Sequence, residues 1–154
     1  MTDIKSKSQR SKNMSNIKGK NTKPEFAVRK YLTSKGIKYR CNVKDLPGKP
    51  DISIKKYKTA IFVNGCFWHA HENCKDFKTP KSNINFWNEK LNSNVARDLK
   101  NIKTLQKSGY KTFIIWECEI KAKNFSSINS AITAINTAKN ISINNPVHFK
   151  YKNL

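Results

Sequence analysis

Three cysteines and one histidine have the types and spacing of a metal site. Cys66, His71 and Cys74 lie within nine residues, and Cys118 follows much later in the chain. Three thiolates and one imidazole complete a tetrahedral zinc site, and a site with no open position is structural rather than catalytic. The alternative is a set of buried free thiols, because free cysteine is often buried. That alternative leaves His71 without a role, so the pattern favours zinc.

Asp51 and His69 indicate a second kind of chemistry close to this segment. Asp51 follows a proline at the start of a predicted strand, and a hairpin would bring it beside Val63 and Asn64. A carboxylate next to a backbone carbonyl can bind Mg²⁺, which keeps most of its waters and promotes phosphodiester hydrolysis. His69 is the natural general base, because imidazole titrates near neutral pH. Two alternatives stay open: a Pro-Asp pair is often only turn chemistry, and His69 could replace His71 as a zinc ligand.

Adjacent aromatic residues in the same segment suggest contact with a partner. Phe67 and Trp68 are neighbours in the chain, and Trp87 opens a predicted helix. Aromatic side chains on a basic surface can stack on bases or wedge into a duplex. Core packing is the ordinary alternative, and we expect it for Trp116. Phe67 and Trp68 cannot both face one core, so at least one should be available to a partner.

The charge of the chain restricts its partners. Lys and Arg number 31 against 10 Asp and Glu, and the formal net charge is +21. Nucleic acid is the simplest partner, because each neutralised phosphate releases counterions. No stretch is long and apolar enough to span a membrane, and no signal peptide is recognisable. We therefore expect a cytoplasmic protein with reduced thiols.

The 154 residues suffice for one domain, with a basic arm before it and a tail after it. Residues 1–21 are predicted to be a DNA-binding arm in which Met14 and Ile17 could anchor a short helix, and a frayed terminus is the alternative. Residues 22–120 form the body. Residues 121–154 have no clear role beyond one helix, indicated by the spacing of Ile128, Ala131, Ile132 and Ile135.

Periodicity and turn signals within the body predict an α/β fold. The capping box Thr22–Glu25 starts a helix that should end near Lys35, with Ala27, Val28, Tyr31 and Leu32 facing inward. Strands are predicted over 37–43, 51–54, 59–63 and 111–117, with Cys41 as a buried free thiol on the first. A long amphipathic helix over 83–107 should bury Trp87, Leu91, Val95, Leu99, Ile102 and Leu105. Because this helix joins two apolar strands, it predicts a parallel crossover and a three-layer α/β/α fold with a small mixed sheet.

Several blocks of this sequence, in order from about residue 10 to residue 120, resemble the very short patch repair (Vsr) DNA mismatch endonucleases. The blocks are 10–14, Thr22–Glu25, Asp45–Asp51, Gly65–His69, Phe86–Trp87, Val95–Asp98 and Ile115–Cys118. The resemblance implies a restriction-endonuclease-like fold with a structural zinc site, in which residues 22–120 are the endonuclease domain. It also implies nicking of one DNA strand on the 5′ side of the thymine in a T·G mismatch, the lesion left when 5-methylcytosine deaminates.

The resemblance further implies a role for each site residue. Asp51 would ligate Mg²⁺ together with the Val63 carbonyl, Glu25 would support that site, and His69 would be the base. Zinc would be held by Cys66, His71, Cys74 and Cys118. Phe67, Trp68 and Trp87 would wedge beside the mismatch while the arm grips the minor groove. Wedging costs less at a wobble pair, which stacks less stably.

Two positions depart from the family pattern. The best-known members carry a second catalytic histidine where this chain has Asn64, which can orient a water but cannot shuttle a proton. The gap between His71 and Cys74 is also one residue longer, which makes Glu72 the nearest substitute ligand.

Two alternatives to this function remain: a zinc-stabilised DNA-binding protein of the same fold without nuclease activity, and a restriction-type nuclease that cuts matched duplex. The expected partners are mismatched duplex DNA and mismatch-repair proteins. We expect a bacterial, nucleoid-associated monomer.

Overall fold

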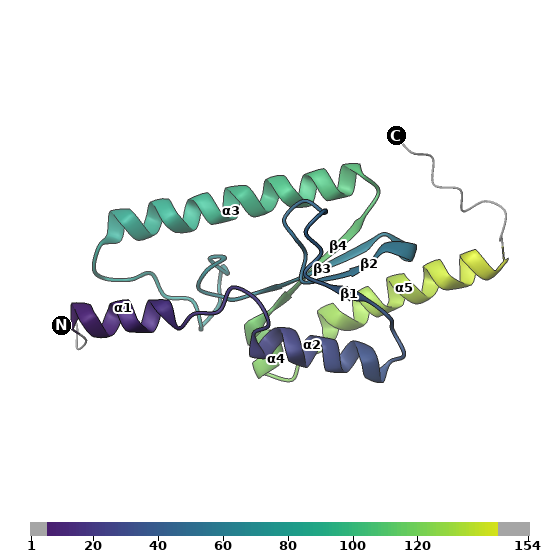
Figure 1. Cartoon of the computed structure of the whole chain (residues 1–154), viewed down its shortest axis with the longest axis horizontal. Coiled ribbons are helices and arrows are strands. Elements are labelled where there is room, and N and C mark those ends of the chain that lie inside the picture. The colour runs from purple at the N-terminus through teal and green to yellow at the C-terminus, as the bar shows by residue number, and fades with distance from the viewer. Residues whose placement is uncertain (1–5, 145–154) are drawn as a thin grey trace.

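The computed structural model describes residues 6–144, which form one four-stranded sheet with helices on both sides (Figure 1). The elements are α1 (Lys7–Ser15), α2 (Lys23–Ser34), β1 (Arg40–Cys41), β2 (Ile52–Ile54), the 3₁₀ turn η1 (Lys55–Tyr57), β3 (Thr59–Asn64), α3 (Ile84–Lys107), β4 (Lys111–Trp116), α4 (Glu117–Lys121) and α5 (Ser126–Asn144). The predicted parts of the arm and tail at residues 1–5 and 145–154 lie outside the described residues.

The sheet has the predicted mixed topology. Its strand order is β1-β2-β3-β4, with β2 antiparallel to both neighbours and β3 parallel to β4. Helix α3 is the crossover between the two parallel strands and lies over one face, while α2 and α5 lie over the other (Figure 1). Because β3 and β4 are parallel and Asn64 pairs with Trp116, the carboxyl ends of these two strands lie side by side at the same end of the sheet.

The main core lies between the sheet, α2 and α5. Its buried members include Val28 and Leu32 from α2, Ile61 from β3, Ile115 from β4, and four residues of α5. These four are Ile128, Ala131, Ile132 and Ile135, so the predicted helix near the C-terminus is confirmed. Leu32 is fully buried, and truncating such a side chain to alanine costs about 2–5 kcal/mol.

The predicted strand over 37–43 is wrong in length, and the predicted burial of Cys41 is wrong. Only Arg40 and Cys41 form β1, and Cys41 is exposed. The strand is at the edge of the sheet and pairs only with β2, and Asn42 follows it with φ of 49° in the left-handed region. The alternation does mark an inward face, since Ile37 is buried and Tyr39 packs against the core, but only Arg40 and Cys41 pair with β2.

The inner face of α3 also differs from the prediction. Leu91 and Leu105 are buried as expected, but Leu99 is 53% exposed. Asn94 is buried instead, and Asp98 is half-buried one turn later. The helix has apolar contacts near its ends and polar contacts in its middle, where it faces the cleft described below.

Helix α1 forms as predicted, but Met14 and Ile17 do not anchor it by burial. They are 46% and 47% exposed, and α1 has no buried residue. Its N-terminus is stabilised by a capping box between Ser6 and Gln9. Within residues 6–144, no helix has the length and apolar character needed to cross a membrane.

Candidate active site and metal cluster

Asp51 lies immediately before β2, at the edge where β3 and β4 end. Its carboxylate accepts a hydrogen bond of 2.7 Å from the Val63 N–H. In a strand the N–H and C=O of one residue point to the same side, so the Val63 carbonyl lies on the edge of β3 that faces Asp51. Burial raises the pKa of the Asp51 carboxyl to about 6, with the Val63 N–H lowering it and nearby Glu25 raising it. A cation beside Asp51 would offset the free-energy cost of ionising this buried carboxyl.

The loop before Asp51 is packed tightly against α3. Gly48 has φ of 74°, and a Cβ there would lie 3.0 Å from the Asn101 side chain and 3.2 Å from the Phe62 ring. Only glycine suits both the conformation and the close approach. This packing fixes the position of the Pro50–Asp51 pair.

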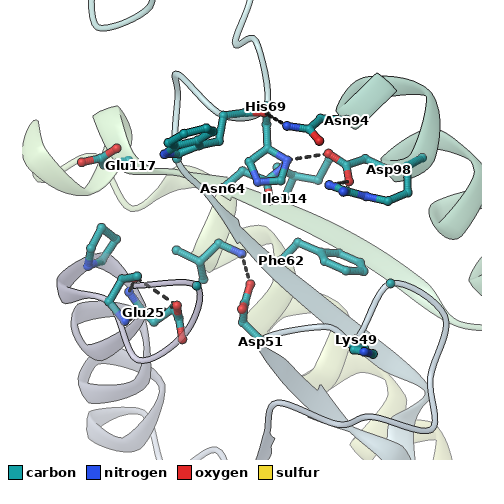
Figure 2. A pocket seen from close by; sticks show the side chains of 18 of the residues that line it. Glu25, Lys49, Asp51, Phe62, Asn64, His69, Asn94, Asp98, Ile114 and Glu117 are labelled. Carbon is teal, nitrogen blue, oxygen red and sulfur yellow. Dashed lines mark hydrogen bonds and ion pairs between the residues drawn. The ribbon is translucent and has the colours of Figure 1, made fainter. Parts of the chain in front are cut away.

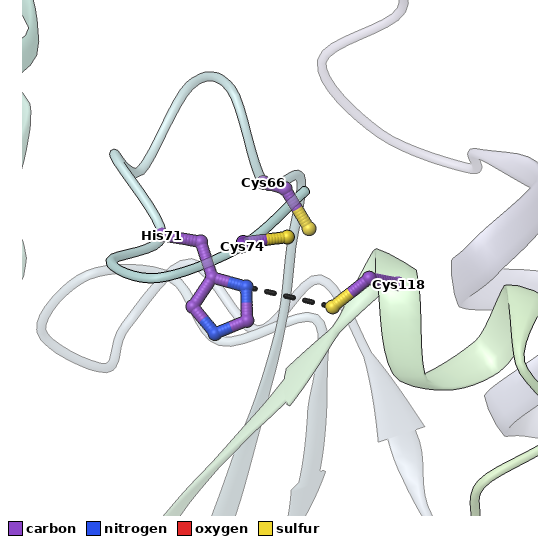
Figure 3. Close-up of side chains that lie close together, drawn as sticks. All are labelled: Cys66, His71, Cys74 and Cys118. Atoms are coloured by element: carbon purple, nitrogen blue, oxygen red, sulfur yellow. Dashed lines mark hydrogen bonds between the residues drawn. The ribbon is translucent and has the colours of Figure 1, made fainter. Parts of the chain in front are cut away.

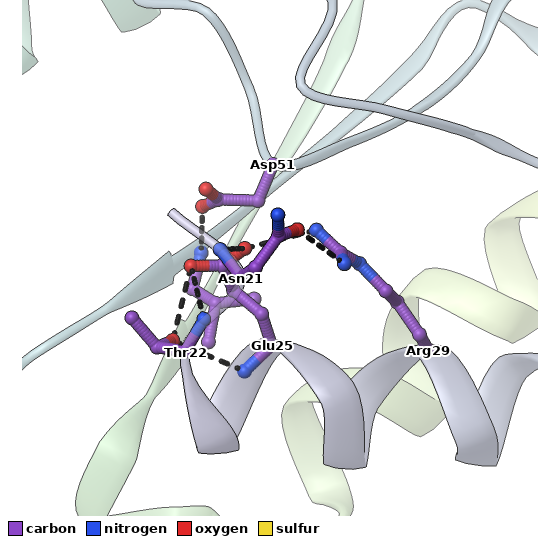
Figure 4. Close-up of polar contacts among 6 residues, drawn as sticks. Asn21, Thr22, Glu25, Arg29 and Asp51 are labelled. Atoms are coloured by element: carbon purple, nitrogen blue, oxygen red, sulfur yellow. Dashed lines mark hydrogen bonds and ion pairs between the residues drawn. The ribbon is translucent and has the colours of Figure 1, made fainter. Parts of the chain in front are cut away.

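Glu25 lies near Asp51, but its two oxygens already accept hydrogen bonds (Figure 4). One oxygen accepts from the Asn21 N–H at 2.9 Å and from Arg29 at 2.9 Å. The other accepts from the hydroxyl and N–H of Thr22, at 3.0 and 3.3 Å. The bond from the Thr22 N–H, together with the bond from the Glu25 N–H to the Thr22 hydroxyl oxygen, forms the predicted capping box of α2. In this arrangement, Glu25 can act on a metal at Asp51 through its charge or through water.

His69 is held against α3. Its Nδ1 lies 2.5 Å from a carboxylate oxygen of Asp98, and the Asn94 amide donates to the Trp68 carbonyl at 3.0 Å. Figure 2 shows His69 and Asp51 on opposite sides of the same pocket. The contact with Asp98 leaves Nε2 as the ring nitrogen available to a substrate or water. His69 takes no part in the cysteine cluster, so the alternative in which it replaces His71 is wrong.

The space between Asp51 and His69 is a cleft of about 740 Å³. Asn64, buried at the end of β3, lines it together with Glu117. The cations on its walls are Lys18, Lys49, Lys90 and Arg97. A groove that combines carboxylates, an imidazole and four cations suits a phosphate backbone.

Aromatic side chains form a cluster beside this cleft. The Phe67 ring centroid lies 5.1 Å from that of Trp68 and 5.2 Å from that of Trp87, both in edge-to-face contact. Phe86 packs edge-on against Trp87 at 5.3 Å and is 58% exposed. The three predicted wedge residues therefore lie together, and Phe86 is a further exposed member. Trp116 is half-buried and stacks on His71 at 3.8 Å, so it borders the metal cluster rather than the core.

The four predicted zinc ligands also lie together (Figure 3). The candidate ligand atoms of Cys66, His71, Cys74 and Cys118 are all within 4.8 Å of one another. His71 Nδ1 lies 3.5 Å from the Cys118 sulfur. Cys118 is the second residue of α4 and directly follows the predicted strand end.

Loop geometry explains how the longer gap is accommodated. Ala70 and Asn73 have φ of 46° and 54°, and these left-handed residues turn the chain between its ligands. Glu72 is exposed and is not part of the cluster, so it does not replace His71. Burial raises the pKa of the Cys66 thiol to about 12. A thiol in such a place ionises only when a metal displaces its proton.

Asp98 and Asn94 are not among the predicted site residues. A signal for them exists, because they stand at i and i+4 on the inner face of an otherwise apolar helical pattern. Polar residues on a buried helical face point to a site rather than to a core.

Comparison with known proteins agrees with the geometry. The family described as DNA mismatch endonuclease Vsr matches residues 2–75. The type II nicking enzyme V.NmeAIP of Neisseria meningitidis is 50% identical over 123 residues, covering 80% of this chain and 87% of the relative. The DNA mismatch endonuclease Vsr of Escherichia coli is 40% identical over 123 residues, covering 80% and 78%. The type II nicking enzyme V.XorIIP of Xanthomonas oryzae is 41% identical over 120 residues, covering 78% and 88%.

These relatives and the carboxylate–histidine cleft define a DNA endonuclease, a hydrolase of phosphodiester bonds. The chain belongs to the Vsr family of DNA endonucleases, which confirms the resemblance found in its sequence.

Proposed function

We propose that this endonuclease nicks one strand of duplex DNA on the 5′ side of the thymine in a T·G mismatch, in a reaction that depends on Mg²⁺. The observation that carries the proposal is the placement of Asp51 and His69 on opposite sides of one basic cleft, beside an aromatic cluster. The names of the relatives support it, since one is a mismatch endonuclease and others are nicking enzymes.

The residues at Asp51 fit a magnesium ion. The carboxylate is buried enough to raise its pKa, and the Val63 N–H contact leaves carboxylate lone pairs and the neighbouring carbonyl for a cation. Oxygen ligands are those that Mg²⁺ prefers, and two of them suffice because the ion keeps most of its waters. When bound, the ion would stabilise negative charge on the phosphate.

The protein's own groups account for the proton transfer. Asp98 accepts from Nδ1–H of His69, which fixes the tautomer with a free lone pair on Nε2. That nitrogen takes a proton from the attacking water, and the Asp98 carboxylate stabilises the imidazolium that forms. Asn64 can donate an amide hydrogen bond in the same cleft, which orients a water or a phosphate oxygen without accepting the proton.

The Cys/His cluster fits a structural zinc ion. A tetrahedral site with Zn–S bonds of about 2.3 Å places its sulfurs roughly 3.8 Å apart, and the four candidate ligand atoms here lie within 4.8 Å of one another. All four positions are filled by protein atoms, which leaves none open for a substrate. We assign this ion the task of folding the loop that carries His69.

The aromatic cluster accounts for mismatch selectivity. Phe67 packs edge to face against Trp68 and Trp87, the two indole rings are tilted against each other at 6.0 Å, and the three side chains stand beside the cleft as one packed unit. Inserting such a unit between base pairs requires unstacking, which costs a few kcal/mol and costs less at a weakly stacked wobble pair.

A nicking assay tests the proposal. Duplexes that differ only in T·G or C·G at one position are incubated with the protein and Mg²⁺, and the strands are separated under denaturing conditions. We expect the T·G duplex to be nicked in its thymine strand and the C·G duplex to stay intact. Asp51→Ala and His69→Ala should abolish the cut. Equal cutting of both duplexes would favour a restriction-type nuclease, and no cutting of either would favour a DNA-binding protein.

A further inference from the structure

Arg29 on α2 joins the N-terminal arm to the body through an exposed bond to Asn21 and a largely buried pair with Glu25 (Figure 4). Its Nη1 donates to the Asn21 side-chain oxygen at 2.9 Å, and its Nη2 donates to Glu25 at 2.9 Å. The same Glu25 oxygen accepts the backbone N–H of Asn21 at 2.9 Å. The three residues therefore close a ring of charge-assisted hydrogen bonds, which are stronger than neutral ones.

The arm enters the body through a special conformation at this joint. Asn21 has φ of 55°, in the left-handed region that asparagine tolerates better than most residues. Just before it, Ile17, Lys18 and Gly19 line the catalytic cleft. Helix α1 buries no residue, so packing does not set its direction. The ring of hydrogen bonds around Arg29 instead holds the backbone at Asn21, where the chain passes from the arm into α2.

The environment of Arg29 indicates a role other than stability. Its side chain is only 11% exposed and that of Glu25 only 4%. Among residues 6–144, the buried Arg29 Nε has no hydrogen-bond partner. A buried charge with one unsatisfied donor is costly, and a buried ion pair is weak evidence for stabilisation. Such a pair can instead specify one geometry, here that of the arm.

We propose that Arg29 is a positioning residue for DNA binding, which fixes the arm at its joint with α2 so that the arm stands beside the cleft before DNA arrives. The proposal rests on the proposed function only in taking duplex DNA as the ligand. A fixed arm binds more tightly than a loose one, because less conformational freedom is lost on binding. The guanidinium is suited to this task, since its planar fork bonds two acceptors at once.

The test compares Arg29→Gln with Lys30→Gln in the full-length protein. Lys30 is the exposed next residue of α2, so both variants lose one positive charge. Affinity for a T·G duplex is measured by fluorescence anisotropy without Mg²⁺. We expect Arg29→Gln to weaken binding about tenfold, or about 1.4 kcal/mol, and Lys30→Gln less than about threefold. With Mg²⁺, KM should rise in parallel, and kcat at saturating DNA should change less than KM does.

A second variant guards against misfolding of Arg29→Gln. Asn21→Gly tolerates the left-handed backbone and removes the side chain that carries the acceptor, so it should weaken binding in the same direction. The double variant should bind DNA about as weakly as the single variant with the lower affinity, because both changes remove the same Arg29–Asn21 interaction.

Three outcomes would overturn the positioning role: Arg29→Gln binding as tightly as Lys30→Gln, a fall in kcat with unchanged KM, or losses that add fully in the double variant. If Arg29→Gln does not fold, as judged by circular dichroism, Asn21→Gly decides alone. If the wild-type protein binds duplex DNA but does not nick T·G duplexes preferentially, the proposed function is contradicted. The affinity comparison between Arg29→Gln and Lys30→Gln still tests the positioning role in that case.

Discussion

The catalytic cleft and the Cys/His cluster are neighbours built in different ways. Asp51, Asn64 and Asp98 stand on or beside regular elements, at the ends of strands and on a long helix. The cluster takes three of its four candidate ligands from an irregular loop, and only Cys118 lies on a helix. His69 links the two regions, since it lies between the cluster members Cys66 and His71 in the chain and contacts Asp98 of the cleft in space. We therefore expect substitutions of cleft residues to leave the fold around the cleft intact. Loss of the cluster should instead displace His69 from the cleft.

Asp51→Asn should cause the largest loss of activity. It removes the proposed metal ligand, and we expect nicking to fall by at least about a thousandfold. Asn is close in shape, and the Val63 N–H can still donate to its amide oxygen, so the fold should persist. Gel quantification of nicked strand gives the rate, and circular dichroism checks the fold. Asp45→Asn, at an exposed acid in the neighbouring loop, is the matched control and should stay near wild type. Near-normal nicking by Asp51→Asn would remove this residue from the site.

Cys118→Ser should affect both regions. The cluster would lose one of its four ligands, so we expect about one zinc ion per chain to fall toward none. Melting temperature should drop, and nicking should fall by roughly a hundredfold because the loop no longer presents His69. Elemental analysis by mass spectrometry measures the metal. Cys41→Ser, at the exposed thiol outside the cluster, should retain metal and activity. A Cys118→Ser protein that loses zinc and still nicks normally would separate the two regions.

Asp98→Asn should have an intermediate effect on the cleft alone. The amide cannot stabilise a protonated His69 or fix its tautomer, so we expect about a 10- to 100-fold fall in kcat. Zinc content should not change. The control is Glu89→Gln, an exposed acid on the same helix. A variant with wild-type kcat across the pH range would show that His69 acts without Asp98.

The smallest expected effect is a pH-dependent change in the melting temperature when Asp51 is replaced. Burial raises the pKa of folded Asp51 to about 6, above its value in the unfolded chain. Between these two pKa values the folded state binds more protons, so stability falls as pH rises through that window. Without added Mg²⁺, Asp51→Asn should therefore melt a few degrees higher than wild type at pH 7.5, at about 2–4 °C per kcal/mol. The gain should vanish near pH 4. If Asp51→Asn melts at a lower temperature than wild type at pH 7.5, the ionised Asp51 carboxylate does not destabilise the folded protein.

Much of the fold follows from local sequence patterns. The capping box at Thr22–Glu25, the apolar run before Asn64 and the helical spacing of α3 and α5 are strong signals, because each element buries a face. The order of elements then imposes the parallel crossover. The edge strand was predicted too long because alternation does not report how many neighbours a strand has. Leu99 was misplaced because a helical pattern does not show that a cleft interrupts the core.

The candidate site was predicted unevenly. The Cys/His cluster could be predicted because thiols and imidazoles at short spacing are rare and have few other uses. Asp98 has a signal in its helical spacing from Asn94, whereas Phe86 and Arg29 could not be singled out, since each is an ordinary residue whose role comes from distant partners. The Arg29 ring in particular depends on the backbone conformation at Asn21, which no local pattern specifies.

The most direct measurement is the position of the cut. A T·G duplex labelled on either strand is incubated with protein and Mg²⁺, and the products are run beside a sequencing ladder. We expect one cut, in the thymine strand on the 5′ side of the thymine, and none when Mg²⁺ is omitted. Cuts in both strands, or equal cutting of a C·G duplex, would contradict a cleft that hydrolyses one phosphodiester beside an aromatic wedge.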